Sequence, residues 1–307
     1  MVFGLMRVFL QDMGNGWQCP KKRSKKRLCF RRGTVAPGRG LRYPCHWDDD
    51  KTGKIMSGEV ISELDKGVLR LTLNRPEKKN ALTRKMYTDL TEALNGAQTD
   101  EAVRCVVLAA NGADFCGGND IVDFAEGAQA FTAEDLDIET LPVFRFLKAL
   151  TFFEKPLVCA LQGQAVGVGV TLLLHCDLVV AADTISLSLP FLKLGLIPEA
   201  GSTVLLPQRI GHARAFGWMA LGEKIAAADA LRLGLVNRVV TSDALPAAAL
   251  EVATIAASLS PSSVRYTKGL MRDAESLWAV VKEEGRIFRQ QLNSPEARAA
   301  FAAFLSR

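Results

Sequence analysis

Leu161-Gln-Gly-Gln-Ala-Val-Gly-Val-Gly-Val-Thr-Leu-Leu-Leu174 is the stretch that decides the fold of this chain. It follows an apolar run, residues 156–161, that is typical of a buried strand, and it ends in an apolar helical segment. Gly163, Gly167 and Gly169 fall within seven residues, and glycine is favoured where a backbone bends sharply or a ligand comes close. A strand that turns into a helix start offers unpaired N–H groups with partial positive charge, as an oxyanion hole requires. The same glycines also fit a turn that lets a strand and a helix pack tightly, so by themselves they leave both interpretations open.

Strands and helices alternate around this stretch, and helices follow it toward the C-terminus. The patterns predict strands at residues 68–73, 103–109, 156–161, 177–182, 185–189 and 236–240. They predict a helix that opens at Thr83 and further helices at residues 141–150, 213–221, 227–233, 244–258, 263–272, 275–291 and 295–305. This order favours stacked β–β–α units of an α/β fold with a trailing helical module.

The first 56 residues differ in charge from the rest of the chain. They hold 13 Lys and Arg against 4 Asp, whereas the remaining residues hold 25 Lys and Arg against 29 Asp and Glu. With a basic cluster, Lys21–Arg27, and no apolar periodicity, this leader is expected to be disordered. It fits a nucleic-acid-binding or nuclear-type patch, part of a transit sequence, or residues upstream of a natural start at Met56. The last is favoured, because a compact pattern begins directly after Met56.

Composition favours an intracellular protein. Seven cysteines without a C-x-x-C pair indicate reduced thiols. The longest apolar run, residues 165–174, falls well short of the ~20 residues that span a bilayer, so no membrane segment is predicted. The C-terminal residues 304–307 are not a peroxisomal S-K-L signal, and the cytoplasm is the default expectation.

Familiar catalytic signatures are absent from the sequence. It contains no G-x-S-x-G, P-loop, H-E-x-x-H or G-x-G-x-x-G motif, and no metal site is predicted. His175 and Cys116 are interpreted as core or capping and packing residues, and Asp120 as a local cap or turn residue. Glu199 lies between a strand region and a helix start, where it fits either a catalytic acid or a first-turn partner of a helix dipole.

A family resemblance links these pieces. It rests on an ordered series of motifs: Asn74-Arg-Pro, Lys79-Asn-Ala-Leu82, Phe115-Cys-Gly-Gly-Asn-Asp120, Gly163…Gly167-Val-Gly169, Cys176-Asp177 and Leu194-Gly…Pro198-Glu-Ala-Gly201. From about Glu59 to the C-terminus, the chain resembles the crotonase (enoyl-CoA hydratase/isomerase) superfamily.

The resemblance implies a crotonase-like spiral of β–β–α units over residues 57–250 and a helical trimerisation module over residues 251–307. It implies acyl-CoA thioester substrates, a homotrimer or a hexamer, and no cofactor, since coenzyme A is part of the substrate. An oxyanion hole would come from the N–H groups of Gly117 and Val168. Ala81 would lie beside the nucleotide, and the coenzyme A site would be lined by Gly117, Gly118, Asn119, Asp120 and Ile121.

The chain departs from the family pattern at two positions, and these departures favour isomerisation over hydration. Hydratases of this family carry two catalytic glutamates, and the matching positions here are Thr171 and Phe191. The chain instead resembles single-glutamate Δ3,Δ2-enoyl-CoA isomerases, in which the residue matching Glu199 is the base. Thr171 is expected either to offer a hydroxyl near the acyl chain or to pack. One alternative is a hydratase, or an enzyme of another crotonase-type acyl-CoA reaction, that uses Asp123 or Glu126. The other is an inactive crotonase scaffold that binds RNA through the leader.

Overall fold

The computed structural model describes residues 58–121, 123 and 137–305, all of which belong to the unit of residues 43–307. The leader, residues 1–56, and Glu126 lie outside the described residues, so the expectations placed on them stay predictions.

The main sheet has six strands in the order β1-β2-β3-β4-β6-β9. β1 and β2 form an antiparallel pair, and each later neighbouring pair is parallel. β3 and β4 consist entirely of buried residues, the continuous apolar character of parallel strands that are covered on both faces. The strands are β1 (Val60–Asp65), β2 (Val68–Leu73), β3 (Cys105–Ala110), β4 (Leu157–Leu161), β6 (Leu178–Ala182) and β9 (Arg238–Val240).

A smaller sheet runs in the order β5-β7-β8, formed by β5 (Gln164–Val166), β7 (Ser186–Ser188) and β8 (Ile225–Ala226). β5 follows β4 and β7 follows β6, so each turn of the chain adds one parallel strand to each sheet. A single bridge between Cys116 and Ala165 brings the segment after β3 into the same pattern. This repetition is the predicted β–β–α spiral.

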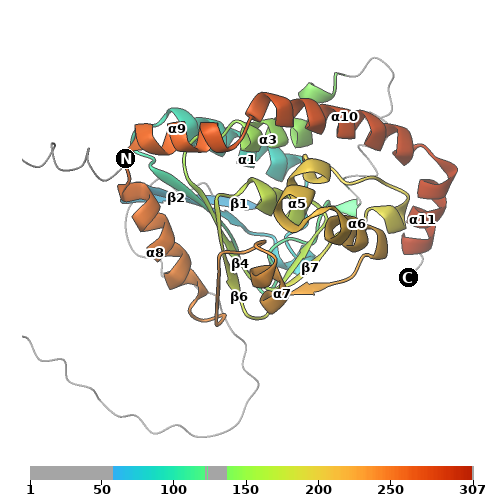
Figure 1. Cartoon of the computed structure of the whole chain (residues 1–307), viewed down its shortest axis with the longest axis horizontal. Coiled ribbons are helices and arrows are strands. Elements are labelled where there is room, and N and C mark those ends of the chain that lie inside the picture. The colour runs from blue at the N-terminus through green and yellow to red at the C-terminus, as the bar shows by residue number, and fades with distance from the viewer. Residues whose placement is uncertain (1–57, 122, 124–136, 306–307) are drawn as a thin grey trace, which may run out of the picture. The chain divides into compact units, whose positions relative to one another are not determined.

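Helices cover the sheets, and α10 runs over α3 along one side (Figure 1). α1 packs against α3 and begins at Thr83, whose hydroxyl accepts a hydrogen bond from the Met86 N–H at 3.1 Å, as an N-cap does. The helices are α1 (Arg84–Thr99), α3 (Pro142–Thr151), α4 (Val168–Thr171), α5 (Ser202–Ile210), α6 (His212–Leu221), α7 (Ala227–Arg232), α8 (Leu245–Ser258), α9 (Pro261–Met271), α10 (Ala274–Leu292) and α11 (Pro295–Leu305). Short 3-10 turns lie at Pro76–Lys78, Ile138–Thr140, Leu172–His175 and Leu192–Leu194.

Most predicted elements are confirmed to within a few residues, but strands β1, β5 and β8 and helix α5 were missed. The sequence interpretation passed directly from the glycine turn to a helix, whereas residues 164–166 first form β5 through parallel pairing with β7. α5 was missed because Gly201 precedes it and Pro207 lies inside it, and both residues weaken a helical pattern.

The predicted division at residue 250 falls inside α8, a helix that packs against β3, β4 and β6. α8 therefore belongs to the layer that covers the main sheet, and the helices that follow it are α9, α10 and α11.

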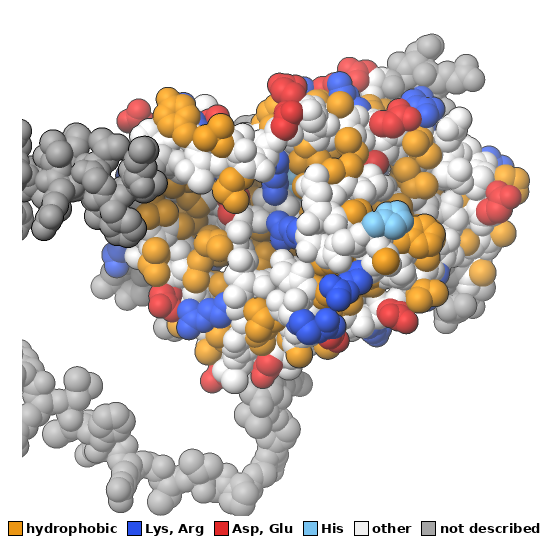
Figure 2. Space-filling model, in the orientation of Figure 1, with side chains coloured by type: hydrophobic (Ala, Val, Ile, Leu, Met, Phe, Trp, Pro, Cys, Tyr) orange, Lys and Arg blue, Asp and Glu red, His pale blue; other side chains and the backbone are white. Residues whose placement is uncertain are grey.

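α9 has no buried residue, and large hydrophobic side chains at its C-terminal end are exposed. Leu270 is 90% exposed and Met271 82% exposed, and hydrophobic side chains lie over this helix on the face shown in Figure 2. The predicted trimer or hexamer stays a prediction. In the described part of the chain no single helix has both the length and the hydropathy to cross a bilayer, although α8 and α9 meet these criteria as a pair bent by 104°.

Candidate active site

Glu199 lies in the bend that leads into α5. The Thr171 hydroxyl, fully buried on α4, donates a hydrogen bond to Glu199 Oε1 at 2.6 Å. Burial raises the pKa of Glu199 to about 7; the Thr171 hydrogen bond opposes this rise and the charge of Glu284 adds to it. A carboxylate with such a pKa can both accept and return a proton near neutral pH. The sequence left open whether Thr171 offers its hydroxyl near the acyl chain or only packs. In the structure this hydroxyl donates to Glu199.

The carboxylate of Glu199 faces a mostly apolar cavity of about 100 Å³ between α1, α3 and α10. Its polar wall includes Tyr87 and Asn119, which are joined by a hydrogen bond from the Tyr87 hydroxyl to Asn119 Oδ1 at 2.6 Å. Burial raises the pKa of Tyr87 well above its usual value, so the phenol stays protonated and acts as the donor. The apolar lining residues are Leu82, Leu141, Pro142, Val143, Phe144, Leu147, Ala200, Val281 and Phe288.

A second cavity, of about 450 Å³, gathers most of the other predicted site residues. It is lined by Gly117, Gly118, Asn119, Ile121, Val168 and Phe191, together with residues of α10 and α11. Asn119 and Phe288 line both cavities. The two hollows therefore meet at these side chains, with Glu199 on one side and the predicted oxyanion residues on the other.

The two glycine turns lie directly against each other. The Val166 N–H donates to the Cys116 carbonyl at 2.9 Å, and a Cβ on Gly169 would lie 2.7 Å from that same carbonyl oxygen. A side chain at position 169 would force the turns apart, so the glycine there permits the close approach. The sequence had left open whether these glycines serve tight packing or an oxyanion hole, and they do provide tight packing.

Only one of the two predicted oxyanion donors is open in this structure. Val168 is the first residue of α4, and its N–H has no hydrogen-bond acceptor among the described residues, whereas the N–H groups of Gly167, Val170 and Thr171 are all engaged. The Gly117 N–H instead donates to the Lys79 carbonyl at 2.8 Å. The Lys79 carbonyl belongs to a turn in which Lys79 and Asn80 are both left-handed (φ 51° and 54°). The role of the two amides in an oxyanion hole stays a prediction.

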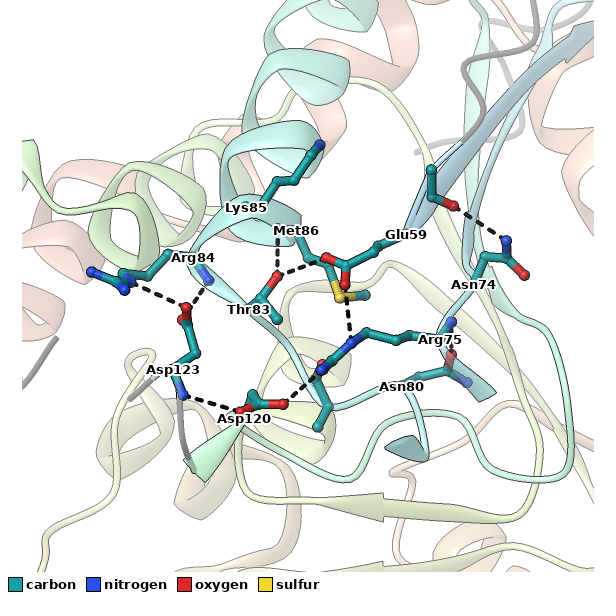
Figure 3. A network of polar contacts seen from close by, with 12 residues as sticks. Glu59, Asn74, Arg75, Asn80, Thr83, Arg84, Lys85, Met86, Asp120 and Asp123 are labelled. Atoms are coloured by element: carbon teal, nitrogen blue, oxygen red, sulfur yellow. Dashed lines mark hydrogen bonds and ion pairs between the residues drawn. The ribbon is translucent and has the colours of Figure 1, made fainter. Parts of the chain in front are cut away.

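A polar network holds Asp120, the last residue of the Gly117–Asp120 segment (Figure 3). Arg75 lies between two carboxylates, with its Nε 3.0 Å from Glu59 Oε1 and its Nη1 2.8 Å from Asp120 Oδ2. Arg75 Nη1 also donates to the Ala81 carbonyl at 3.0 Å. Asp120 accepts from the Asp123 N–H at 3.1 Å, which confirms its interpretation as a local cap. Ala81 lines neither cavity described above, and its predicted place beside the nucleotide stays untested.

Comparison with known proteins defines the family. The enoyl-CoA hydratase/isomerase family model matches residues 63–307. The chain is 35% identical over 218 residues to 1,2-epoxyphenylacetyl-CoA isomerase of Escherichia coli, covering 71% of this chain and 83% of that protein. It is 35% identical over 250 residues to enoyl-CoA delta isomerase 2 of Rattus norvegicus, covering 81% of this chain and 63% of that protein. A crystal structure of an enoyl-CoA hydratase/isomerase from Pseudoalteromonas atlantica is 42% identical, with a TM-score of 0.75 and coverage of 81% and 97%.

The chain belongs to the enoyl-CoA hydratase/isomerase family.

Within this enoyl-CoA hydratase/isomerase fold, the positions predicted to replace two hydratase glutamates carry no acid. Thr171 serves as the hydrogen-bond donor to Glu199. Phe191 lines the second cavity and lies next to Gly167, whose added Cβ would be 3.8 Å from the Phe191 ring.

Cys116 and His175 behave as the sequence indicated. Cys116 is fully buried, and burial raises the pKa of its thiol to about 12, so it stays protonated as a packing residue. His175 is fully buried in the core, where burial lowers its pKa to about 3 and keeps the ring neutral. Among the described residues no group of three or more His, Cys, Asp or Glu side chains is arranged to hold a metal ion.

Sequence reasoning missed Tyr87 as a lining residue. Tyr87 follows Met86 in α1 and lies on its buried side with Leu90 and Leu94. A buried tyrosine needs a hydrogen-bond partner for its hydroxyl, and this was the local signal for Tyr87 on a helix face whose other buried residues, apart from Thr91, are apolar.

Proposed function

We propose that this protein is an acyl-CoA isomerase that moves a carbon–carbon double bond from C3 to C2 of an enoyl-CoA thioester. The proposal rests above all on the state of the three acids that line the smaller cavity. Asp120 is paired with Arg75, and Asp123 with the N–H and Nε of Arg84 at 2.7 and 3.2 Å. Glu199 has no cationic partner among the described residues and has a pKa of about 7. It is therefore the acid best suited to move a proton.

A single base suffices for this reaction. Glu199 in its carboxylate form takes a proton from C2, and the electrons of the broken C–H bond pass into the thioester as an enolate. The resulting carboxylic acid then returns the proton at C4, and the double bond moves into conjugation with the thioester. Hydration requires one group to activate water and another to manage the proton on the α-carbon. Asp123, the candidate second acid for a hydratase, is held by Arg84.

The enolate oxygen would accept a hydrogen bond from the open Val168 N–H. This donor is fixed in α4 and is not reoriented during the reaction, which is the property that makes an oxyanion hole effective. Thr171 lies one helical turn later on the same helix and donates to Glu199, so α4 carries both the oxyanion donor and a residue that orients the base. The Gly117 N–H would serve as the second donor if the thioester oxygen displaced the Lys79 carbonyl.

Coenzyme A enters this scheme as part of the substrate, and no separate cofactor is required. The larger cavity is suited to the thioester end, because it contains Gly117 and Val168. The apolar cavity beyond Asn119 and Phe288 is suited to the acyl chain.

A two-substrate assay tests the reaction assignment. Purified full-length protein is given a 3-enoyl-CoA and, separately, a 2-enoyl-CoA, and products are followed by the absorbance of the conjugated thioester and by mass. We expect the 3-enoyl substrate to yield the 2-enoyl product, and hydration of the 2-enoyl substrate to be at least ~10²-fold slower, because a second acid–base group is missing. Hydration at a rate equal to or above isomerisation would overturn the proposal.

A further inference from the structure

The bend that carries Glu199 has a backbone that requires external support. Ala200 has φ 62° and Gly201 φ 71°, both in the left-handed region. This region favours glycine, and an alanine persists there when surrounding contacts fix it. A Cβ on Gly201 would lie 2.5 Å from Leu277 Cδ1, so α10 packs directly onto the bend.

Glu284 of α10 supplies one of these contacts. Its Oε2 accepts the Gly201 N–H at 2.6 Å, and its Oε1 accepts the Thr203 N–H at 3.0 Å and the Thr203 hydroxyl at 2.5 Å. α5 has no side-chain cap of its own at Gly201, and Glu284 provides the missing acceptors from a different helix. Glu284 is 4% exposed. Burial raises the pKa of its carboxyl, whereas the three hydrogen bonds, all from donors, oppose this rise and favour the ionised form.

His175 supplies the contact on the other side of the bend. Its Nε2 lies 2.8 Å from the Ala200 carbonyl, and because a carbonyl only accepts, Nε2 is the donor. The ring is neutral, as its lowered pKa shows. Glu284 and His175 therefore hold the two ends of one peptide group, Ala200–Gly201, directly after Glu199: Glu284 accepts its N–H and His175 donates to its carbonyl.

We propose that Glu284 is a positioning residue for Glu199, which holds the bend that presents the base and places a fixed negative charge behind it. The proposal rests on the proposed function, since it treats Glu199 as the proton-transferring group. α10 also contributes Val281, Gly285 and Phe288 to the cavity that Glu199 faces, so one helix both shapes this cavity and holds the base.

The charge of Glu284 acts on Glu199 in a defined direction. A nearby negative charge makes ionisation of Glu199 less favourable and raises its pKa, in addition to the larger effect of burial. The polar and titratable groups around Glu199 in the described residues are Thr171, Tyr87 and Cys116 near its carboxyl, Arg84, Asp120 and Asp123 on the cavity wall, and Glu284 behind the bend. Arg84, Asp120 and Asp123 have partners of their own, which leaves Glu284 as the buried carboxylate that acts on Glu199.

The experiment compares pH profiles of Glu284→Gln and His175→Leu with wild type, using a 3-enoyl-CoA substrate. Because the ionised form of Glu199 is the base, wild-type kcat should rise with pH through about 7. Glu284→Gln removes the like charge, so the rising limb should move to lower pH, and kcat on the plateau should fall by up to about 10²-fold with little change in KM. His175→Leu loosens the same bend without a change of charge. Its kcat should therefore fall, while the rising limb of its pH profile stays at the wild-type position.

A purely structural role for Glu284 predicts a different pattern. Both variants would then lose activity, and the rising limbs of their pH profiles would either stay at the wild-type pH or move by the same amount. Either result overturns the proposal. If Glu284→Gln does not fold, Thr203→Val removes one donor to Glu284, weakens its ionised form and should move the limb in the same direction by a smaller amount.

A titration that needs no turnover separates this proposal from the proposed function. The side-chain carboxyl carbons of glutamate are labelled with ¹³C, and the Glu199 signal is identified by its loss in Glu199→Gln. Its midpoint should lie near 7 in wild type and lower in Glu284→Gln. A lower midpoint in a protein that does not isomerise 3-enoyl-CoA would refute the isomerase assignment alone. An unchanged midpoint in an active isomerase would refute the role of Glu284 alone.

Discussion

Glu199→Gln is expected to lower kcat for isomerisation by ~10²–10⁴-fold, the usual contribution of a positioned acid–base group. Glutamine retains the shape of the side chain and an oxygen that accepts the Thr171 hydroxyl, but it cannot take a proton from C2. KM should change little, because the Glu199 carboxyl is a small part of a cavity lined mainly by apolar side chains. Steady-state kinetics with a 3-enoyl-CoA gives both constants.

A stability measurement distinguishes a loss of catalysis in Glu199→Gln from a loss of folding. The pKa of Glu199 is raised from 4.5 to about 7 in the folded chain, so the folded state resists ionisation that the unfolded state undergoes freely. Stability contributed by the protonated acid is lost as pH rises from about 4.5 to about 7. Glu199→Gln should therefore be at least as stable as wild type above pH 7. The matched control is Asp123→Asn, an acid on the same cavity wall that should keep most of its activity. Full isomerase turnover in Glu199→Gln would refute proton transfer by Glu199.

Val168→Pro is the second substitution with a large expected effect. Proline has no N–H and is tolerated at the first position of a helix, where Val168 stands. Its N–H is engaged by no described acceptor, so the change removes a donor to the enolate without breaking a hydrogen bond of the fold. The expected fall in kcat is ~10²–10³-fold, as for the loss of one oxyanion-hole donor.

Val168→Ala is the matched control, since it shortens the side chain and keeps the N–H. It should retain kcat within a few-fold of wild type, although the loss of two buried methyl groups lowers its stability. Equal activities of the proline and alanine variants would show that this amide does not stabilise the transition state.

Sequence-based prediction succeeded where a residue type has one dominant structural role, such as glycine in a turn or threonine at a helix N-cap. Gly163 and Gly167, both with φ 54°, form the turns that the sequence predicted. Thr83 caps α1 through Met86, and the apolar run at Cys105–Ala110 is a buried parallel strand. In these places backbone preference and burial act in the same direction.

Contacts between distant segments could not be predicted in this way. The Gly117 N–H donates to the Lys79 carbonyl, 38 positions earlier in the chain, and no local pattern in the sequence indicates this partner. Glu284 lies 83 residues after Gly201 in the sequence and looks like an ordinary charged residue of a long helix, yet it holds the bend after Glu199. Single strands such as β5 also depend on a partner elsewhere in the chain.

The path of the transferred proton tests the central claim most directly. A 3-enoyl-CoA deuterated at C2 is converted by wild-type protein in ordinary water, and the product is analysed by NMR for deuterium at C4. Because Glu199 faces an apolar cavity and carries the removed atom itself, we predict that a measurable share of the deuterium appears at C4. Complete conversion with no deuterium at C4, even at early times, would contradict transfer by a single shielded carboxylate.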